Sequence, residues 1–413
     1  MKRLKTTQRP WLFMMAGLIM AYSRADTTAE LRAKADAVII KELTDNVSAA
    51  KEAGAVFAAA NRLAAEQDNR GAIFYFVKGL ELSPWDMSQQ LNYAKVLLTT
   101  GKEAEAKTVA RLVYKTTEQD DVLQESAQIA GLAMPDMPAP FIALPEAYQN
   151  PKAICLVKIG PVSDWIIQRA AQALAEKLGA PMFIYPEVLA LPLPTRSAYD
   201  RWAKNLKNDI SWQHPFVVRQ MKLLKIQSRA DATADQTLDL LAILSKAQGQ
   251  EITRERLEEI KNEAKENDAQ WDAALLLKLL ADKVPLRADI VYVGVTGVDM
   301  YTDDNNYVFG QAQVGNGFCV ISYKRYRADF NREHDNQARL LERVHKQLLS
   351  SVGFALGVPR PTDPRSARSY PNSLEEHDRK ALWLDAACIQ GFEAALGYAL
   401  PEKTKEESRK GQL

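Results

Sequence analysis

The stretch Glu342-Arg-Val-His-Lys-Gln-Leu-Leu-Ser-Ser-Val-Gly-Phe-Ala-Leu-Gly357 decides how this chain is interpreted. In an H-E-x-x-H helix, two histidines stand one turn apart with a glutamate beside the first, and a glycine turn and a third ligand follow. The stretch keeps this frame, and the positions of its chemical groups hold Ser350, Ser351, Phe354 and Arg360. The frame of a metal-binding helix is therefore present without its ligands.

Four segments on both sides of this helix show which family of proteins the chain resembles. They are Ile290-Val-Tyr-Val-Gly-Val-Thr-Gly-Val-Asp-Met-Tyr301, Asn306-Tyr-Val-Phe-Gly-Gln-Ala312, Val320-Ile-Ser-Tyr-Lys-Arg325 and Ser373-Leu-Glu-Glu-His-Asp-Arg-Lys380. In order and spacing they resemble archaemetzincins, a family of zinc peptidases. The resemblance covers residues 152–398 and implies a metzincin-like α+β fold with a mixed sheet, in which the charged residues 227–283 look like a helical insertion.

The resemblance also indicates which chemistry is missing. The family's two helix histidines, its glutamate base and its third ligand align with Ser350, Phe354, Ser351 and Arg360, respectively. A hydroxyl, a phenyl ring and a guanidinium do not replace imidazole or carboxylate ligands of zinc, and serine is no base near neutral pH. Although the family implies zinc, we therefore expect no catalytic residue, no metal and no cofactor here, as in an inactive peptidase homologue.

The family's remaining metal-site residues are changed as well. Its methionine beneath the site aligns with Arg368, and a second zinc site aligns with Pro361, Ser366, Asp385 and Cys388. Only one thiol survives in that set. The cysteines Cys155, Cys319 and Cys388 are far apart in sequence, which predicts neither a disulfide framework nor a metal-ligand spacing.

Peptide binding is the function that can persist without a metal. The resemblance implies an edge strand beside the cleft, where a substrate chain adds as a further strand, formed by Tyr307, Val308, Phe309, Gly310, Gln311 and Ala312. Backbone pairing of this kind needs no zinc. The leading hypothesis is therefore an exported, non-catalytic binding or scaffold protein with a peptide or protein partner.

Several alternatives stay open. The domain could keep only its fold, with Phe354 and Arg360 filling the vacated space. A metallopeptidase could use other ligands, such as carboxylates or His345. The helical half could also be the functional part, with the metzincin-like half as a spacer.

Other polar residues have simpler interpretations than metal binding. Glu342 and His345 are three residues apart on a helix, which favours a solvated face. His334 and His377 lie in charged runs and are expected at the surface, and His214 precedes a proline at a helix start. The segment 303–306, Asp-Asp-Asn-Asn, lacks the glycine and distant glutamate of a calcium loop, so it predicts a polar turn between strands.

Composition places the chain among ordinary globular proteins. It has 413 residues, 47% hydrophobic and 25% charged, which suffices for two or three domains. Its formal net charge is +1, and no basic stripe is present. Nothing here predicts a nucleic-acid partner.

The amino terminus resembles an export signal over residues 1–25. Lys2 and Arg3 begin a positive start, a short apolar run follows from Trp11 to Ala21, and Ser23-Arg24-Ala25 is a cleavage candidate. An uncleaved signal anchor is the alternative. We expect an exported protein, periplasmic or secreted, with no membrane segment beyond the signal.

Residues 26–135 are alanine-rich and free of strand signals, which predicts helices. Ala60 and Leu63 recur 34 residues later as Ala94 and Leu97, and Ala72 recurs as Ala106. This spacing is similar to tetratricopeptide repeats, with a plain helical bundle as the alternative.

The remaining order follows from composition. Residues 136–150 are expected to be a proline-rich linker. The resemblance implies an archaemetzincin-like domain over 151–398, and its pattern predicts an opening strand at 153–159, a helix at 165–178 and a strand at 181–185. Helix-rich segments are expected at 196–227 and 235–283. The charged tail 399–413 is expected to be frayed.

Overall fold

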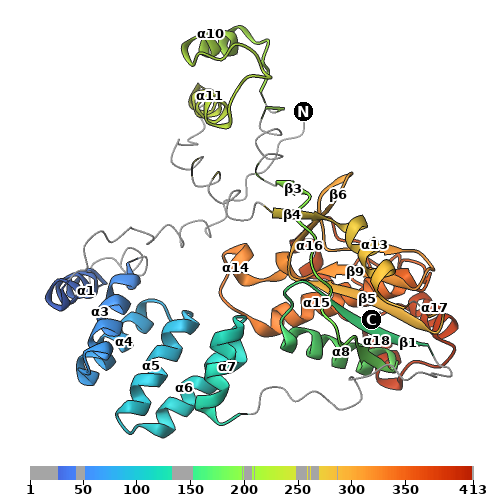
Figure 1. Cartoon of the computed structure of the whole chain (residues 1–413), viewed down its shortest axis with the longest axis horizontal. Coiled ribbons are helices and arrows are strands. Elements are labelled where there is room, and N and C mark those ends of the chain that lie inside the picture. The colour runs from blue at the N-terminus through green and yellow to red at the C-terminus, as the bar shows by residue number, and fades with distance from the viewer. Residues whose placement is uncertain are drawn as a thin grey trace. The chain divides into compact units, whose positions relative to one another are not determined.

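The structure, a computed structural model, describes residues 27–42, 52–132, 152–197, 199, 207–208, 210–247, 258, 261, 269–285 and 287–411 (Figure 1). The predicted signal, 1–25, and linker, 136–150, lie outside these residues. No helix within them is long and apolar enough to cross a membrane. Two compact units are present: Met1–Ala139 with Ser163–Ala170 and Tyr326–His345, and Pro140–Val162 with Ala171–Arg325 and Lys346–Leu413.

The first unit begins with helices, as the alanine-rich sequence predicts. They are α1 (Thr28–Glu42), α3 (Ala53–Ala65), α4 (Asn69–Leu82), α5 (Met87–Thr99), α6 (Glu103–Thr116) and α7 (Asp120–Ala130). Ala60 in α3 and Ala94 in α5 are fully buried, and so are Ala72 in α4 and Ala106 in α6. The predicted 34-residue spacing thus joins equivalent core positions, while the assignment to tetratricopeptide repeats stays a prediction.

The end of these helices is bonded to a distant part of the same unit. Glu118, between α6 and α7, is 3% exposed. Its carboxylate accepts hydrogen bonds from the backbone N–H groups of Ala328 (2.8 Å) and Asn336 (3.1 Å). Asp335 in turn accepts from the Thr117 hydroxyl at 3.1 Å. Desolvation by burial raises the pKa of Glu118, and the hydrogen bonds from these two backbone donors oppose that rise.

A mixed sheet forms the centre of the second unit. Its order is β2-β1-β5-β9-β8, with β8 antiparallel to β9 and the other pairs parallel. The strands are β1 (Ala153–Ile159), β2 (Met182–Ile184), β5 (Ile290–Thr296), β8 (Gly310–Gln313) and β9 (Phe318–Ser322). The predicted strand–helix–strand opening is confirmed by β1, α8 (Asp164–Leu178) and β2. A mixed α+β fold is therefore present, with β8 at one end of the sheet order.

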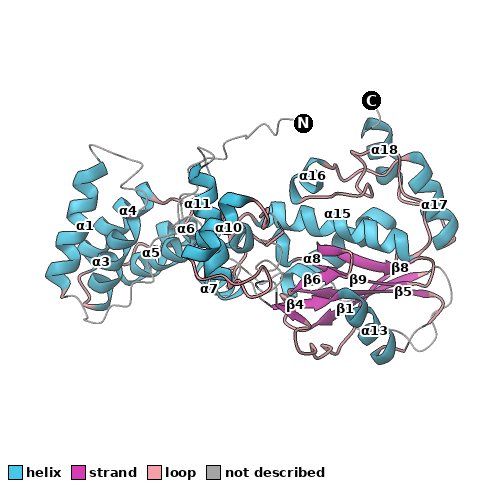
Figure 2. Cartoon of the chain, turned by 90° about the horizontal axis from the view of Figure 1, so that it is seen from above, coloured by secondary structure: helices cyan, strands magenta, loops and turns pink. Residues whose placement is uncertain are grey.

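Helices cover both faces of this sheet. α13 (Ala273–Lys283) packs its leucines against the face that carries Tyr292 and Val320. α15 (Gln337–Ala355) lies along the opposite face (Figure 2). Because β5 is buried along its whole length, its near-continuous apolar sequence is what a central parallel strand requires.

A second, smaller sheet was not predicted. Its order is β3-β4-β6-β7, formed by β3 (Arg196–Ser197), β4 (Ala269–Asp272), β6 (Asp299–Thr302) and β7 (Asn305–Val308). Two of these strands lie in the segments expected to be helix-rich, which do contain α10 (Pro215–Leu223) and α11 (Ala234–Ala247). Strands of two and four residues are too short to show a period of two, and Asp272 both ends β4 and caps α13. The polar turn predicted at 303–306 is present at 303–304 between β6 and β7, and Asn305 and Asn306 belong to β7 instead.

The expectation of a frayed tail is wrong. The chain continues after β9 with η2 (Lys324–Tyr326), α14 (Ala328–Asn331), α15, α16 (Leu374–Arg379), α17 (Ala386–Leu396) and α18 (Glu402–Gly411). Thr404 and Ser408 of α18 are buried, and the Thr404 hydroxyl donates to the Lys177 carbonyl at 2.6 Å. The tail is therefore a packed helix, because small polar residues four positions apart form its inner face.

Candidate functional site

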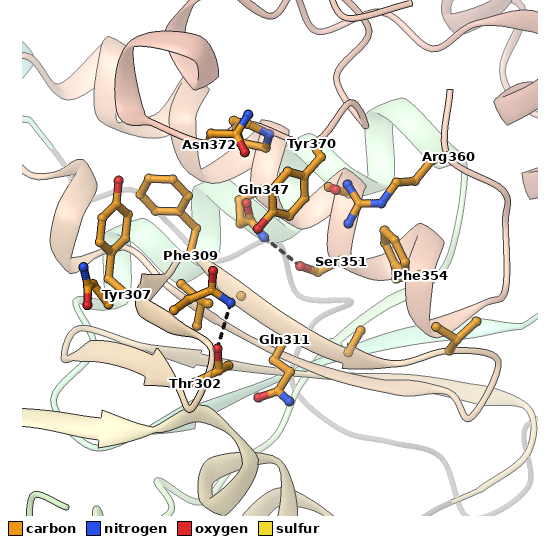
Figure 3. A pocket seen from close by; sticks show the side chains of 18 residues that line it. Thr302, Tyr307, Phe309, Gln311, Gln347, Ser351, Phe354, Arg360, Tyr370 and Asn372 are labelled. Carbon is orange, nitrogen blue, oxygen red and sulfur yellow. Dashed lines mark hydrogen bonds between the residues drawn. The ribbon is translucent and has the colours of Figure 1, made fainter. Parts of the chain in front are cut away.

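A cleft of about 460 Å³ lies beside β8 in the second unit (Figure 3). One wall is β8 with the residues that precede it, and the other is formed by the last turns of α15 and the loop from Arg360 to Asn372. The lining comprises Thr302, Asn305, Asn306, Tyr307, Val308, Phe309, Gly310, Gln311, Ala312, Val314, Gln347, Ser350, Ser351, Phe354, Arg360, Tyr370, Pro371 and Asn372. The residues of the predicted peptide-binding strand and the four altered metal-site positions thus line one cleft. The predicted strand is not continuous, however: Tyr307 and Val308 belong to β7 of the smaller sheet and Gly310 to Ala312 belong to β8, with Phe309 between them.

The pairing of β8 with β9 decides which backbone groups face the cleft. Gly310 lies opposite Ile321, and Ser322 donates its N–H to the Phe309 carbonyl at 2.9 Å. Because hydrogen-bonded and non-bonded pairs alternate in an antiparallel ladder, Gly310 and Ala312 belong to the non-bonded pairs. Their N–H and C=O groups therefore point away from β9. Both residues line the cleft, so these polar groups are presented to it.

The positions aligned with the metal site hold no metal-binding set. Ser350 and Ser351 are 8% and 5% exposed, and the Ser351 hydroxyl accepts a hydrogen bond from the Gln347 amide at 3.0 Å. The guanidinium carbon of Arg360 lies 4.1 Å from the centre of the Phe354 ring. Zinc requires imidazole, carboxylate or thiolate donors, and a guanidinium repels a cation. These side chains do not fit a zinc ion.

The rest of the described part of the chain also lacks a group of metal ligands. No three His, Cys, Asp or Glu side chains converge there to hold a metal ion. Glu342 on α15 is exposed, as a solvated helix face predicts, whereas His345 is half-buried and its Nε2 is buried. His214 caps α10 by accepting from the Phe216 N–H at 3.3 Å, which confirms the predicted helix start. His334 is exposed and stacks on Trp85.

His377 corrects an expectation, because it is fully buried rather than at the surface. Ser373 caps α16, accepting from the Glu376 N–H at 3.2 Å. This cap turns His377 inward, where its ring lies 5.6 Å from that of Phe309, the aromatic residue that lines the cleft just before β8. The burial of His377 could not be predicted from the charged run Glu-Glu-His-Asp-Arg. Only the helical register decides which residues of this run face inward and which face the solvent.

Arg368 fills the region that aligns with the family methionine and second metal site. It is fully buried and donates to the carbonyls of Pro359 (2.6 Å) and Val358 (2.7 Å) and to the Cys388 sulfur (3.2 Å). Asp385 instead caps α17, accepting from the Cys388 N–H at 2.8 Å. Burial raises the pKa of the Cys388 thiol to about 12, so the thiol is protonated at neutral pH. A guanidinium therefore joins the loop to α17.

Further cations lie behind the cleft. Lys346 and Lys380 are 1% and 3% exposed. Their ammonium groups reach the backbone carbonyls of Asp378 and Ser369, each at 3.3 Å. Burial, and then the charges of Lys346 and Arg360, lower the pKa of Lys380 from 10.5 to about 7. Sequence reasoning missed this cluster, because two lysines 34 residues apart give no sign that they share a buried site.

An ion pair holds the other end of the cleft. Arg325 binds Asp299 with two hydrogen bonds, Nε to Oδ1 at 2.6 Å and Nη2 to Oδ2 at 2.7 Å. Its guanidinium lies 4.0 Å from the centre of the Tyr307 ring. Gln270 of β4 donates to the same Asp299 carboxylate at 2.6 Å. These contacts fix Tyr307, and a bidentate pair of this kind is geometrically specific.

Comparison with known proteins gives one family. Residues 256–393 match the model of Peptidase family M54. Archaemetzincin-2 of Homo sapiens is 31% identical over 165 residues, 34% of this chain and 46% of that protein. Archaemetzincin of Methanocaldococcus jannaschii is 35% identical over 111 residues, 27% of this chain and 59% of that protein. The chain thus spans about half the length of these curated relatives.

Solved structures of archaemetzincins were also found. The one from Methanopyrus kandleri is 20% identical, covers 60% of this chain and 96% of its own, and has a TM-score of 0.35. A structure described as a zinc-dependent peptidase from Methanocorpusculum labreanum is 16% identical, covers 58% of this chain and 100% of its own, and has a TM-score of 0.34.

The family match corrects two predictions made from the sequence. An inactive homologue was expected because the aligned ligands are absent, but the matching model and curated relatives are those of a peptidase family. The match is to a peptidase family, and no observation shows that this chain is inactive. The expectation of no cofactor is wrong for the same reason, since zinc is the metal expected for this family. Missing ligands on one helix do not determine the ligand set of a whole protein.

Proposed function

We propose that this chain, with its region similar to Peptidase family M54, binds an extended polypeptide segment as an added strand along β8. The observation that carries this proposal is the outward direction of the Gly310 and Ala312 backbone groups along one wall of the cleft. An edge strand with free N–H and C=O groups is a template for a further strand. The aromatic and amide side chains of the opposite wall then contact the side chains of the bound segment.

The volume of the cleft supports this proposal over the alternative that Phe354 and Arg360 fill the site. Arg360 and Phe354 stack on each other at the cleft wall, and a volume of about 460 Å³ is left between that wall and β8. Gly310 packs closely against α15 and β9, because a Cβ there would lie 2.6 Å from the Gln347 amide nitrogen and 2.9 Å from the Val320 carbonyl oxygen. A side chain at this position would therefore push into α15.

Replacing Ala312 with proline tests the strand pairing. Proline removes an N–H that faces the cleft but leaves the pairing with β9, which does not use that group. Losing this hydrogen bond is expected to weaken binding by about 1–2 kcal/mol, or roughly 5- to 30-fold in Kd. The measurement is fluorescence anisotropy with a library of labelled, extended peptides.

The matched control is on the ligand. Methylating one backbone nitrogen at a time along a bound peptide should weaken binding at alternate positions only, because alternate N–H groups face β8. Equal effects at consecutive positions, or an unchanged Kd for Ala312→Pro at an unchanged melting temperature, would rule out pairing with β8.

Peptide hydrolysis is the second part of the proposal, and the match of residues 256–393 to a peptidase family supports it. Because Ser350, Phe354 and Arg360 do not fit zinc, hydrolysis would use metal ligands other than those of the family. Curated relatives named archaemetzincins make an extended peptide the expected substrate class.

A chelator experiment tests the hydrolysis. We expect the purified protein to cleave quenched fluorescent peptides, to lose this activity with 1,10-phenanthroline and to regain it with added zinc. Elemental mass spectrometry should then find stoichiometric zinc in protein purified without added metal. Cleavage that the chelator does not affect would exclude a metal, and absence of both cleavage and zinc would exclude the metallopeptidase.

The proposed export and the protein partner of the helical repeats rest on the sequence patterns at 1–25 and 26–135. An amino-terminal sequence determined on protein from the native source is expected to begin at Asp26. A native chain that begins at Met1 and is recovered with the cytoplasmic fraction would contradict export.

A further inference from the structure

Arg360 is the only charged residue among those that line the cleft in the described part of the chain. The other lining residues carry amide, hydroxyl, aromatic or apolar side chains. Within the same described part, Arg360 donates no hydrogen bond and forms no ion pair. A guanidinium with five N–H donors is therefore presented to the cleft without an anion.

Two aromatic rings orient this guanidinium. Its central carbon lies 4.1 Å from the centre of the Phe354 ring and 4.7 Å from that of Tyr370. Both distances are within the range of cation–π contacts, which hold the charge against the ring faces and leave the N–H edges available. Figure 3 shows Phe354, Tyr370 and Arg360 on the side of the cleft opposite Gln311 of β8.

Other cationic side chains surround Arg360. Arg368 and Lys380 both interact electrostatically with Arg360. Lys346 acts electrostatically on Lys380, and its ammonium group reaches the Asp378 carbonyl at 3.3 Å. Arg360 itself is exposed, and positive charge along a cleft attracts anions.

We propose that Arg360 binds the carboxylate of an aspartate or glutamate side chain in a polypeptide segment paired with β8. A strand directs alternate side chains to opposite faces, so side chains of a segment beside β8 reach the wall that carries Arg360. Guanidinium and carboxylate form two parallel hydrogen bonds. Because the other lining groups are uncharged, the preferred segment has one acidic residue among uncharged neighbours.

This inference rests on the proposed function, since it takes the ligand to be a strand along β8. It adds the recognised residue type, which the family resemblance does not supply. The position aligned with the family's third metal ligand would here bind substrate through a permanent cation. A contact between Arg360 and a carboxylate depends on neither the zinc content nor the rate of hydrolysis.

The test uses pairs of extended peptides with acetylated and amidated ends. The two members of a pair carry glutamate or glutamine at one position, and all their other residues are uncharged. The full chain is titrated with each pair, and the position of the substitution is moved along the peptide. At the best position we expect the glutamate peptide to bind about 10- to 100-fold more tightly. The preference should decrease as salt is raised.

Variants of the protein assign this preference. Arg360→Met keeps a flexible side chain against Phe354 and removes the charge, so the two peptides should bind it with similar Kd values. Arg360→Lys should keep part of the preference, because lysine cannot form the bidentate pair. Arg365→Met is the matched control: Arg365 pairs with Asp363 at 2.9 Å and does not line the cleft, so the preference should be unchanged.

The outcomes separate this inference from the proposed function. If both peptides bind wild-type protein equally and Ala312→Pro weakens both, strand pairing holds and the role of Arg360 is overturned. If neither binds, or Ala312→Pro has no effect, the proposed function itself fails. A preference that appears only for a free carboxyl terminus, measured on glutamine peptides with and without the terminal amide, would overturn recognition of a side chain.

Discussion

Replacing Gly353 with alanine is expected to lower the free energy of unfolding by about 3 kcal/mol. A Cβ at this position in α15 would overlap Nε and Cζ of Arg368 and lie 2.6 Å from its Nη2. The guanidinium cannot move aside without losing the carbonyls of Val358 and Pro359. Helix propensity alone would favour alanine by about 1 kcal/mol, so even the sign of the effect tests this packing. Urea unfolding of the purified variants measures it.

A double-mutant cycle supplies the control for this effect. Arg368→Met restores the family residue type and removes the group that a Cβ at position 353 would meet. In that background, Gly353→Ala should be neutral or slightly stabilising, which gives a large coupling energy between the two positions. The same loss of stability in both backgrounds would show that Arg368 is not the cause.

Replacing Lys380 with methionine is expected to remove a strong pH dependence of stability. Folding lowers the pKa of Lys380 from 10.5 to about 7, first by burial and then by the charges of Lys346 and Arg360. Below pH 7 the folded and unfolded states are both protonated, and the folded state bears the full cost of the buried charge. Between pH 7 and about 10.5 only the unfolded state keeps the proton, so stability rises with pH across this window.

The expected difference is largest at low pH. One pKa unit corresponds to about 1.4 kcal/mol, so the shift to about 7 amounts to at most about 5 kcal/mol. Lys380→Met should therefore stabilise the protein more at pH 6 than at pH 9, as measured by urea unfolding at both values. Lys403→Met, which removes an exposed lysine of α18, should leave the pH dependence unchanged. A parallel pH profile for wild type and Lys380→Met would contradict the assignment.

The larger sheet could be predicted because its central strands are long and apolar. β1 and β5 are seven residues each, and their buried, near-continuous hydrophobic sequence leaves few alternatives. The similarity to archaemetzincins was also visible from short motifs at 290–301 and 306–312. A strand Tyr307–Ala312 was predicted beside a cleft. All six residues line one, but they are divided between β7 and β8 at Phe309. Whether a peptide binds there stays a prediction.

The remaining features depend on contacts that sequence does not display. The buried positions of His377 and Lys380 follow from the register of one short helix and its cap. Arg368 was recognised as a lost methionine, but its bonds to Val358 and Pro359 require the folded loop. The prediction of inactivity failed for a related reason. Aligned positions show which donors one helix lacks, whereas a ligand set is defined by convergence in space.

The hydrogen bonds of Glu118 have a consequence for modularity. Its buried carboxylate accepts hydrogen bonds from the N–H groups of Ala328 and Asn336, more than 200 residues away, and the Asp335 carboxylate accepts one from the Thr117 hydroxyl. Cutting the chain between the helices and the sheet would expose a carboxylate on one fragment and orphan its donors on the other. The helices therefore cannot be replaced as an independent module without losing these hydrogen bonds. If the repeats were exchanged between relatives, the turn that carries Glu118 would have to be kept. Otherwise the hydrogen bonds to Ala328 and Asn336 would be lost.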